Sequence, residues 1–306
     1  MKIMVFDVGG TEIKYSVMDE QKHRTDSGAV PTPQDTQAQF LDAVYRLYAP
    51  HKDEVTGIAM ALPGFVDNRT GYVSNGGALL YNTATPVGQL LAEKCSCPVI
   101  LENDGKAAAM AELANGALKG CCNAAVFIIG TGVGGGIIAN GQLVRGVHFT
   151  AGEYSFVNTN AEAWDAPDQN MACQCSTSNL LKWYRARKAL PENAPLDGRS
   201  FFAAANAGEP EALEILRRFC HAVAVQIYNL TVLLDVEKVA IGGGISKQPL
   251  LLESLRNAYD GLYASRAGQA YMEGLPRCQI VPCAFSSEAN QVGVAAAYFE
   301  AMQKKC

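Results

Sequence analysis

Residues 5–17 read VFDVGGTEIKYSV, and residues 126–138 read VFIIGTGVGGGII. Each stretch is an apolar run, then a turn of glycines with one threonine, then a second run. In the first stretch Ile13, Tyr15 and Val17 alternate with polar residues, which is the period of a half-buried strand. Each stretch therefore predicts a β-hairpin with a glycine turn, so the same motif is expected twice in the chain.

The composition is that of a globular protein. The chain has 306 residues, of which 49% are apolar and 18% charged, and this length predicts about two domains. The net charge of −5 argues against nucleic acid as a partner, because phosphate backbones bind basic faces. No apolar run reaches the roughly 18 residues that a membrane span needs, and no signal peptide is apparent at the N-terminus. We therefore expect a cytoplasmic protein that binds neither nucleic acid nor membrane.

The cysteines do not predict disulfides or a metal centre. There are ten, and two pairs have C-x-C spacing: Cys95 with Cys97, and Cys173 with Cys175. A reducing compartment disfavours disulfides, and none of the four histidines lies close in sequence to these pairs. A closed zinc site needs four ligands, so no structural zinc is expected.

Apolar runs that alternate with helical patterns predict an α/β fold. We expect an N-terminal α/β domain over residues 1–117, which the last helix (about 289–306) joins, and a larger C-terminal α/β domain over 118–288. Strands are predicted within 2–17, 55–64, 97–104, 124–144, 236–246 and 279–285, and helices within 35–49, 105–118, 176–189, 198–206, 210–234 and 289–305.

The glycine turns suggest phosphate binding, because backbone N–H groups converge where no Cβ obstructs them. Gly130, Gly132 and Gly135 match the dinucleotide fingerprint, but that fingerprint opens a helix, whereas the residues that follow alternate as in a strand. No P-loop lysine motif occurs. Two interpretations stay open: a pair of phosphate-binding hairpins, each with a threonine hydroxyl (Thr11, Thr131), or glycines that only make tight turns.

Further motifs accompany the hairpins: LPG at 62–64, END at 102–104 and AGE at 151–153. Together with DVGGTEIK at 7–14 and GTGVGGG at 130–136, in this order, they resemble the ROK family of repressors, open reading frames and sugar kinases. The resemblance covers nearly the whole chain. It implies the actin-like ATPase (ribonuclease H-like) fold, with two domains of similar topology, related by duplication, and a cleft between them.

The resemblance also implies the site of an ATP- and Mg²⁺-dependent sugar kinase. Asp104 would be the general base, and Asp7 would approach Mg²⁺ through water. The residues alone favour a different explanation for each: Asp104 as a helix N-cap and Asp7 as a turn-entry aspartate. The sugar-binding residues implied are Gly64, Gly77, Asn103, Asp104, Glu153 and Phe156. The ATP-binding residues implied are Asp7, Gly9, Gly10, Thr11, Lys14, Gly130, Thr131, Gly132, Gly134, Gly243 and Gly244.

The sequence departs from the family pattern at two places. Gly105-Lys106 follows END where the family has Ala-Asn, and Lys106 either lowers the pKa of Asp104 or points to solvent. Phe156 takes the place of a histidine, and the zinc loop that follows in relatives looks deleted, so Cys173 and Cys175 are interpreted as ordinary thiols. An aromatic residue at 156 resembles the β-glucoside kinases of the family, although it would equally suit a core position.

We therefore predict a sugar kinase, acting on the 6-hydroxyl of a glucose unit in a β-glucoside or of a free hexose, and a homodimer as in relatives. N-acetylmannosamine kinase and glucokinase are alternatives within this class. Outside it, a catalytically silent sugar-binding protein is the alternative. A repressor is disfavoured, because Asp7 arrives before any helix-turn-helix segment.

Overall fold

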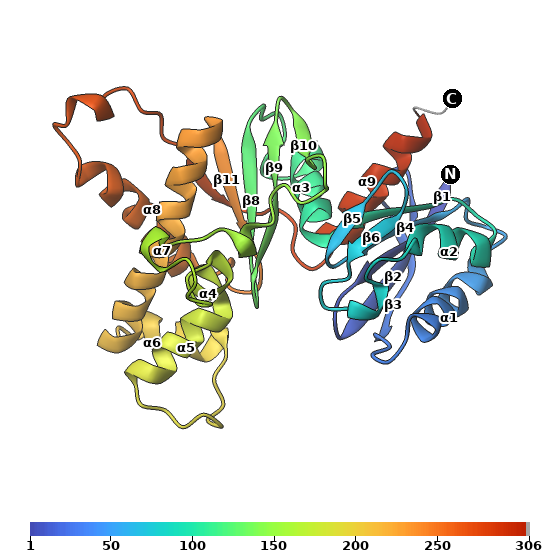
Figure 1. Cartoon of the computed structure of the whole chain (residues 1–306), viewed down its shortest axis with the longest axis horizontal. Coiled ribbons are helices and arrows are strands. Elements are labelled where there is room, and N and C mark those ends of the chain that lie inside the picture. The colour runs from blue at the N-terminus through green and yellow to red at the C-terminus, as the bar shows by residue number, and fades with distance from the viewer. Residues whose placement is uncertain (304–306) are drawn as a thin grey trace. The chain divides into compact units, whose positions relative to one another are not determined.

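The structure, a computed structural model, describes residues 1–303 and divides into two compact units (Figure 1). Unit 1 comprises Met1–Gly116, Leu143–Ala151 and the chain from Ser287 onward, and unit 2 comprises Ala117–Gln142 and Gly152–Ser286. The segment Leu143–Ala151 thus belongs to unit 1, although unit 2 surrounds it in sequence. The predicted end of the last helix, at 304–306, lies outside the described residues.

The elements of unit 1 are mostly strands near its beginning and helices later. The strands are β1 (Lys2–Val8), β2 (Glu12–Asp19), β3 (Arg24–Pro31), β4 (Ile58–Leu62), β5 (Phe65–Asp67), β6 (Tyr72–Asn75) and β7 (Val99–Asn103). The α-helices are α1 (Gln37–Tyr48), α2 (Val87–Cys95), α3 (Asp104–Asn115) and α9 (Ala289–Gln303).

Unit 2 opens with a β-hairpin and continues mainly as helices. Its strands are β8 (Ala124–Ile129), β9 (Val133–Ala139), β10 (Gln142–Val144, which runs into unit 1), β11 (Lys238–Gly242) and β12 (Gln279–Pro282). Its α-helices are α4 (Met171–Cys175), α5 (Thr177–Arg187), α6 (Gly198–Asn206), α7 (Pro210–Leu234) and α8 (Pro249–Ala264).

The two five-stranded sheets have the same topology. Their strand orders are β3-β2-β1-β4-β7 and β10-β9-β8-β11-β12. In each, the central strand pairs antiparallel with the strand after its glycine turn and parallel with the strand on its other side. The two glycine hairpins therefore occupy equivalent positions in two sheets of the same topology, which explains why the hairpin motif occurs twice. The mixed sheets with their helices confirm the predicted α/β class.

Helices cover both faces of the unit 1 sheet. Phe6 and Met60 pack on one face with Phe40 of α1 and Leu91 of α2. On the opposite face, residues that include Ile3 and Ala59 pack with α3 and α9. In unit 2, α4 to α8 share one apolar core with β8 and β11. The parallel strands of both sheets are thus buried, which agrees with their continuous apolar sequences.

Helices α3 and α9 approach unusually closely. A Cβ at Gly293 of α9 would lie 1.7 Å from the backbone oxygen of Ala107 in α3. Only glycine permits this approach, and it matters because α3 begins at Asp104. The last helix thus holds in place the helix that carries the predicted base.

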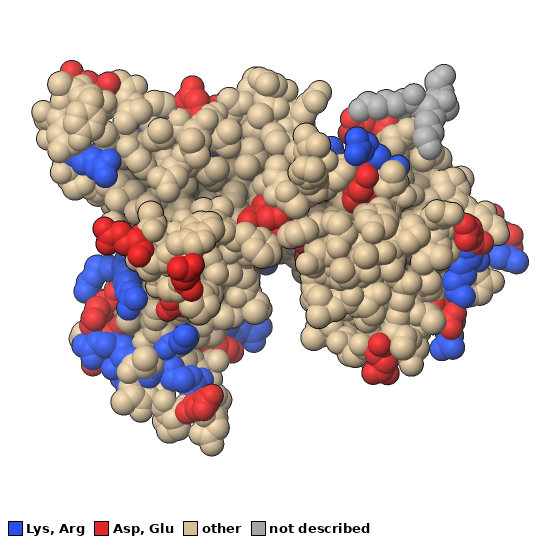
Figure 2. All heavy atoms as spheres, in the orientation of Figure 1, with Lys and Arg blue, Asp and Glu red and all other residues tan. Residues whose placement is uncertain are grey.

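Charged side chains on the helices of unit 2 are mixed in sign. Figure 2 shows Lys and Arg interspersed with Asp and Glu over this region. Two pairs join α5 to the α7 region, Arg187 with Glu214 and Lys188 with Glu209, each at 2.9 Å. Within residues 1–303, no helix is long and apolar enough to cross a bilayer.

Candidate active site

The glycine turn of unit 1 is held by its carbonyl groups. Thr32 Oγ1 donates to Gly9 O at 2.8 Å, Gln34 Nε2 donates to Gly10 O at 2.7 Å, and the Thr32 N–H donates to Thr11 O at 3.0 Å. The shape of the predicted phosphate-binding turn is therefore set by the segment that follows β3. Neither Thr32 nor Gln34 was identified from the sequence.

Asp7 is the penultimate residue of β1, two residues before Gly9 of this turn. Its Oδ1 accepts a hydrogen bond from Asn290 Nδ2 at 2.9 Å. Burial raises the pKa of Asp7, while the amide of Asn290 and the charge of Lys14, which pairs with Asp7 across the hairpin, lower it. Asn290 is a residue that sequence reasoning missed, since nothing in the local sequence of α9 marks it.

The end of β7 places Asn103 and Asp104 at the start of α3. Asn103 is the N-cap, because its Oδ1 accepts from the Lys106 N–H at 3.0 Å. Its Nδ2 donates to Gly64 O at 2.9 Å and to Asp104 Oδ1 at 3.1 Å. An amide side chain makes at most four hydrogen bonds, so one acceptor position of Asn103 remains for a ligand.

The same contacts orient the carboxylate of Asp104. Its Oδ1 accepts from the N–H of Gly105 at 2.8 Å in addition to the Asn103 amide. The alternative that Asp104 is itself the N-cap is wrong, because Asn103 has that role. Asp104 stands in the first turn of α3, where the helix dipole favours an ionised carboxylate by about 0.3–1 kcal/mol.

Gly64 and Gly77 lie against each other. Both have positive φ, +92° and +57°, and a Cβ on Gly64 would meet Gly77 N at 2.7 Å. A Cβ on Gly10 would lie 3.1 Å from that of Ala78, the residue after Gly77. Unit 1 therefore brings the predicted phosphate turn, the LPG turn and the Gly76–Ala78 segment together, and Asn103 joins them through Gly64.

A buried charge cluster lies beside this group. Glu102 is fully buried, and Arg145 Nε and Nη2 both approach its Oε2 at 2.8 Å. Burial raises the pKa of Glu102, while Arg145 and Lys106 lower it. Lys106 is 1% exposed, so the alternative that it points to solvent is wrong. The sequence contained one indication of this cluster: Glu102 interrupts the apolar strand VILEN, and a buried charge needs a partner of opposite charge.

The glycine turn of unit 2 lies beside the third predicted glycine loop. Gly130 O accepts from the N–H of Thr177 at 2.9 Å, which ties the turn to the start of α5. Gly243 has φ +97°, and a Cβ there would lie 2.1 Å from Ile129 O, the residue before the turn. The parallel neighbours β8 and β11 thus end in two adjoining glycine loops, as ligand crevices of α/β sheets require.

The remaining glycines predicted for ATP leave space around them. A Cβ at Gly130, Gly134 or Gly244 would meet nothing within 4 Å. Thr131 is exposed between them. The open side of these turns is therefore available to a phosphate or to an adenosine.

Ser155 connects the second turn to the predicted sugar-facing segment. Its Oγ accepts from the Val133 N–H at 3.0 Å, and a Cβ at Gly132 would lie 2.9 Å from it. Glu153 precedes and Phe156 ends the same short 3₁₀ turn. Phe156 is 70% exposed, so the alternative that it belongs to the core is wrong.

The described residues hold no cluster of three or more His, Cys, Asp or Glu side chains suited to a metal ion. Cys175 is buried at the end of α4, and burial raises the pKa of its thiol to about 12. Cys173 is partly exposed. Since zinc binds the thiolate, burial works against a metal at this C-x-C pair.

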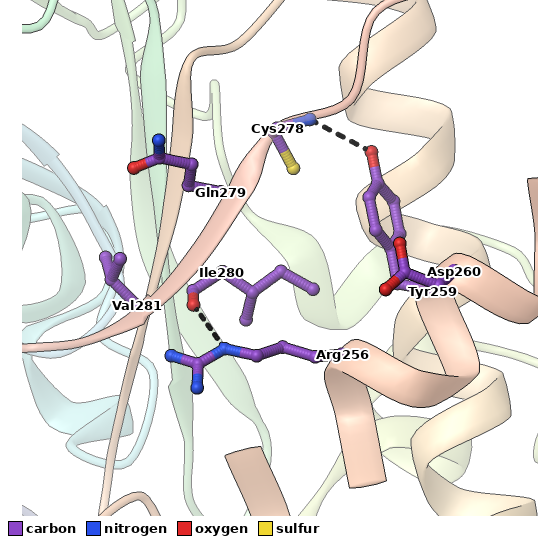
Figure 3. Close-up of a pocket in the computed structure, with 7 residues that line it drawn as sticks. All are labelled: Arg256, Tyr259, Asp260, Cys278, Gln279, Ile280 and Val281. Atoms are coloured by element: carbon purple, nitrogen blue, oxygen red, sulfur yellow. Dashed lines mark hydrogen bonds between the residues drawn. The ribbon is translucent and has the colours of Figure 1, made fainter. Parts of the chain in front are cut away.

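A pocket of about 370 Å³ lies elsewhere, between α8 and β12 of unit 2 (Figure 3). Arg256 points across it and donates from Nε to Ile280 O at 2.9 Å, and the hydroxyl of Tyr259 accepts from the Cys278 N–H at 3.3 Å. None of the residues predicted for catalysis or binding lines it. Its polar side chains secure the edge strand, and the pocket takes no part in the candidate site.

Comparison with known proteins bears on the whole chain. The ROK family profile matches residues 3–303. The chain is 30% identical to the beta-glucoside kinase of Listeria innocua over 257 residues, which are 84% of this chain and 87% of that protein. It is 29% identical to the glucokinase of Halalkalibacterium halodurans over 269 residues, which are 79% of each chain.

Two solved structures have the same fold over almost the full length. A ROK family protein from Streptococcus pneumoniae TIGR4 in complex with sucrose superposes with a TM-score of 0.86 at 28% identity, covering 99% of this chain and all of that one. A ROK family glucokinase from Streptomyces griseus in complex with glucose and AMPPNP gives 0.79 at 25% identity, covering 97% and 99%.

Proposed function

The chain belongs to the ROK family of sugar kinases, and we propose that it transfers the γ-phosphate of ATP to the 6-hydroxyl of a glucose unit in a β-glucoside. The kinase part is supported by the carboxylate of Asp104, which two N–H donors orient at the start of α3. The β-glucoside part is carried by one observation: Phe156 is exposed, three residues after Glu153 in the predicted sugar-facing turn.

In the proposed reaction Asp104 is the general base. As the 6-oxygen attacks, its proton passes to the Asp104 carboxylate, the bond from that oxygen to the γ-phosphorus forms, and the bond to the leaving ADP oxygen breaks. Asn103 contributes by fixing Asp104 and the Gly64 carbonyl, and its remaining acceptor position suits a sugar hydroxyl. The base is thus held before the substrate arrives, which lowers the entropic cost of the attack.

The turn Gly9–Thr11 and the turn Gly130–Gly132 would bind phosphate oxygens through backbone N–H groups and the two threonine hydroxyls. Gly243 and Gly244 would let the adenosine approach the backbone closely. Lys14, which faces Asp7 across the hairpin, adds positive charge for the phosphates.

The residues around Asp7 fit a magnesium ion. Mg²⁺ in kinases is held by one or two carboxylates together with water and the phosphates, and Asp7 supplies a carboxylate beside the phosphate turn. When bound, the ion neutralises charge that develops on the phosphates. Asn290, at the start of α9, orients the Asp7 carboxylate by its hydrogen bond.

Phe156 would form a platform for the second unit of a β-glucoside, since sugar C–H faces pack on aromatic rings. The relatives named as beta-glucoside kinases support this assignment. Glucokinase and N-acetylmannosamine kinase are the competing activities, and a silent sugar-binding protein is the competitor from another class. Each makes a different prediction for substrate choice.

The test is ADP release with cellobiose, gentiobiose, glucose and N-acetylmannosamine, for the wild type and for Phe156→Ala. If Phe156→Ala removes an aromatic contact worth about 0.5–1.5 kcal/mol, the KM for a disaccharide should rise about 2- to 13-fold. The KM for glucose should stay unchanged. Tyr271→Ala, which removes another aromatic side chain that is 74% exposed, is the matched control. A wild type that prefers glucose, with a KM insensitive to Phe156→Ala, contradicts the proposal.

A further inference from the structure

The buried carboxylate of Glu102 joins two parts of the chain that are distant in sequence. Glu102 is the penultimate residue of β7 and directly precedes Asn103 and Asp104. Its Oε2 accepts a hydrogen bond from Arg145 Nε at 2.8 Å and lies 2.8 Å from Arg145 Nη2 in the same ion pair. Its Oε1 accepts the backbone N–H of Asn103 at 3.1 Å. One oxygen therefore holds Arg145, and the other holds the backbone of the predicted site.

Such an ion pair is not a gain in stability by itself. Removing the Glu102 charge from water costs several kcal/mol, whereas the Arg145 side chain stays 27% exposed, and well-packed apolar residues are often as stable as a buried ion pair. The positive groups around Glu102 are Arg145, after β10, and Lys106, on α3. Arg145 contacts the carboxylate directly, and its Nη2 also lies 3.5 Å from Met110 Sδ on α3. The guanidinium thus touches both β7 and the helix that Asp104 begins.

Arg145 also anchors the segment that leads to Glu153. The segment Leu143–Ala151 belongs to unit 1, and the Ala151 N–H donates back to Arg145 O at 3.2 Å. Gly152 and Glu153 follow directly. The segment is also attached through Phe149, because the guanidinium of Arg69 lies 4.7 Å from the centre of its ring.

We propose that Arg145 is a positioning residue for phosphoryl transfer: through Glu102 it fixes the end of β7, and with it Asn103 and Asp104. This inference rests on the proposed function, because it assumes that Asp104 is the base. Arg145 would act through the carboxylate of Glu102, which directly precedes Asn103 and Asp104 in the chain.

The test compares Arg145→Met, Glu102→Gln and the double variant with the wild type in thermal unfolding and in steady-state kinetics. Each single change is expected to lower kcat by about 10- to 100-fold, since misplacement of a catalytic group by about 1 Å costs as much. The KM for ATP should stay unchanged, because the phosphate turn Gly9–Thr11 is held separately by Thr32 and Gln34. Arg69→Met, which removes the cation–π contact with Phe149 of the same segment, should keep wild-type kcat.

The double variant separates positioning from stability. Arg145→Met alone leaves a buried charge without its partner and lowers Tm, whereas the neutral pair restores Tm. We expect kcat of the double variant to stay at least about 10-fold below the wild type although Tm recovers. A kcat that recovers together with Tm, a single Arg145→Met variant with full kcat, or an equal loss in Arg69→Met overturns the inference. Absence of turnover in the wild type overturns the proposed function, and the inference with it.

Discussion

Gly243 and Gly244 are adjacent glycines with opposite surroundings, and this difference makes a sharp prediction. At Gly243 φ is +97°, and an added Cβ would lie 2.1 Å from Ile129 O and 2.7 Å from Ile129 C. These are backbone atoms of β8, so they cannot rotate away. At Gly244 an added Cβ meets nothing within 4 Å. Alanine should therefore be excluded at 243 and accepted by the fold at 244.

The cost of Gly243→Ala has two parts. Left-handed backbone costs an L-residue roughly 1–2 kcal/mol, and overpacking typically adds about 1–3 kcal/mol. We expect the free energy of unfolding to fall by about 2–5 kcal/mol in Gly243→Ala and to change by less than about 0.5 kcal/mol in Gly244→Ala.

Urea unfolding monitored by circular dichroism, with the KM for ATP measured on the same samples, tests this pair. Gly243→Ala should also raise the KM for ATP, because a loop displaced from the end of β8 disturbs the turn Gly130–Gly132. The reasoning fails if Gly243→Ala unfolds within about 1 kcal/mol of the wild type, or if Gly244→Ala loses as much stability.

Two further predictions follow from single contacts. Asn290→Leu removes an amide that lowers the pKa of Asp7, so Asp7 should become protonated at a higher pH. The acid limb of the kcat/KM profile for ATP should therefore shift to higher pH. An acid limb at the wild-type pH contradicts a role of the Asn290 amide in holding Asp7 ionised. Gly293→Ala places a Cβ 1.7 Å from Ala107 O and should destabilise the fold by about 1–3 kcal/mol. Gly261→Ala in α8 has open space around the new Cβ and should stabilise the fold by roughly 0.5–1 kcal/mol. Thermal unfolding of the two variants should give a lower Tm for the first and a higher Tm for the second, and Tm shifts of the same sign contradict this reasoning.

The sequence predicted the elements that have regular patterns. The two hairpins follow from period-two alternation around glycine, and the helices at Thr177–Arg187, Gly198–Asn206 and Pro210–Leu234 match their predicted ranges closely. Helices α2 and α8 were missed. Each begins without a side-chain cap, at Pro86 and Gln248, so no capping residue marks the start. Strand β3 was missed because most of its residues are exposed and polar, and it has no apolar alternation.

The site was predictable as motifs but not as a network. Asn103, Asp104 and Gly64 belong to recognisable short motifs, and the hydrogen bonds among them confirm that they lie together. The partners of the neighbouring carboxylates belong to no such motif: Arg145, which contacts Glu102, is 43 residues away from it, and Asn290, which contacts Asp7, is 283 residues away from it. Such pairs are created by the packing of elements, and no local pattern records which elements meet.

The most direct test of the central claim is ADP release from ATP with and without sugars, in the wild type and in Asp104→Asn. Asparagine keeps the shape of the side chain and removes the basic carboxylate. We expect one sugar to stimulate turnover in the wild type, and Asp104→Asn to lose about 10²- to 10⁴-fold of kcat while ATP binding persists. If no sugar stimulates ADP release although ATP binds, or if Asp104→Asn remains fully active, the assignment of a sugar kinase with Asp104 as its base is wrong.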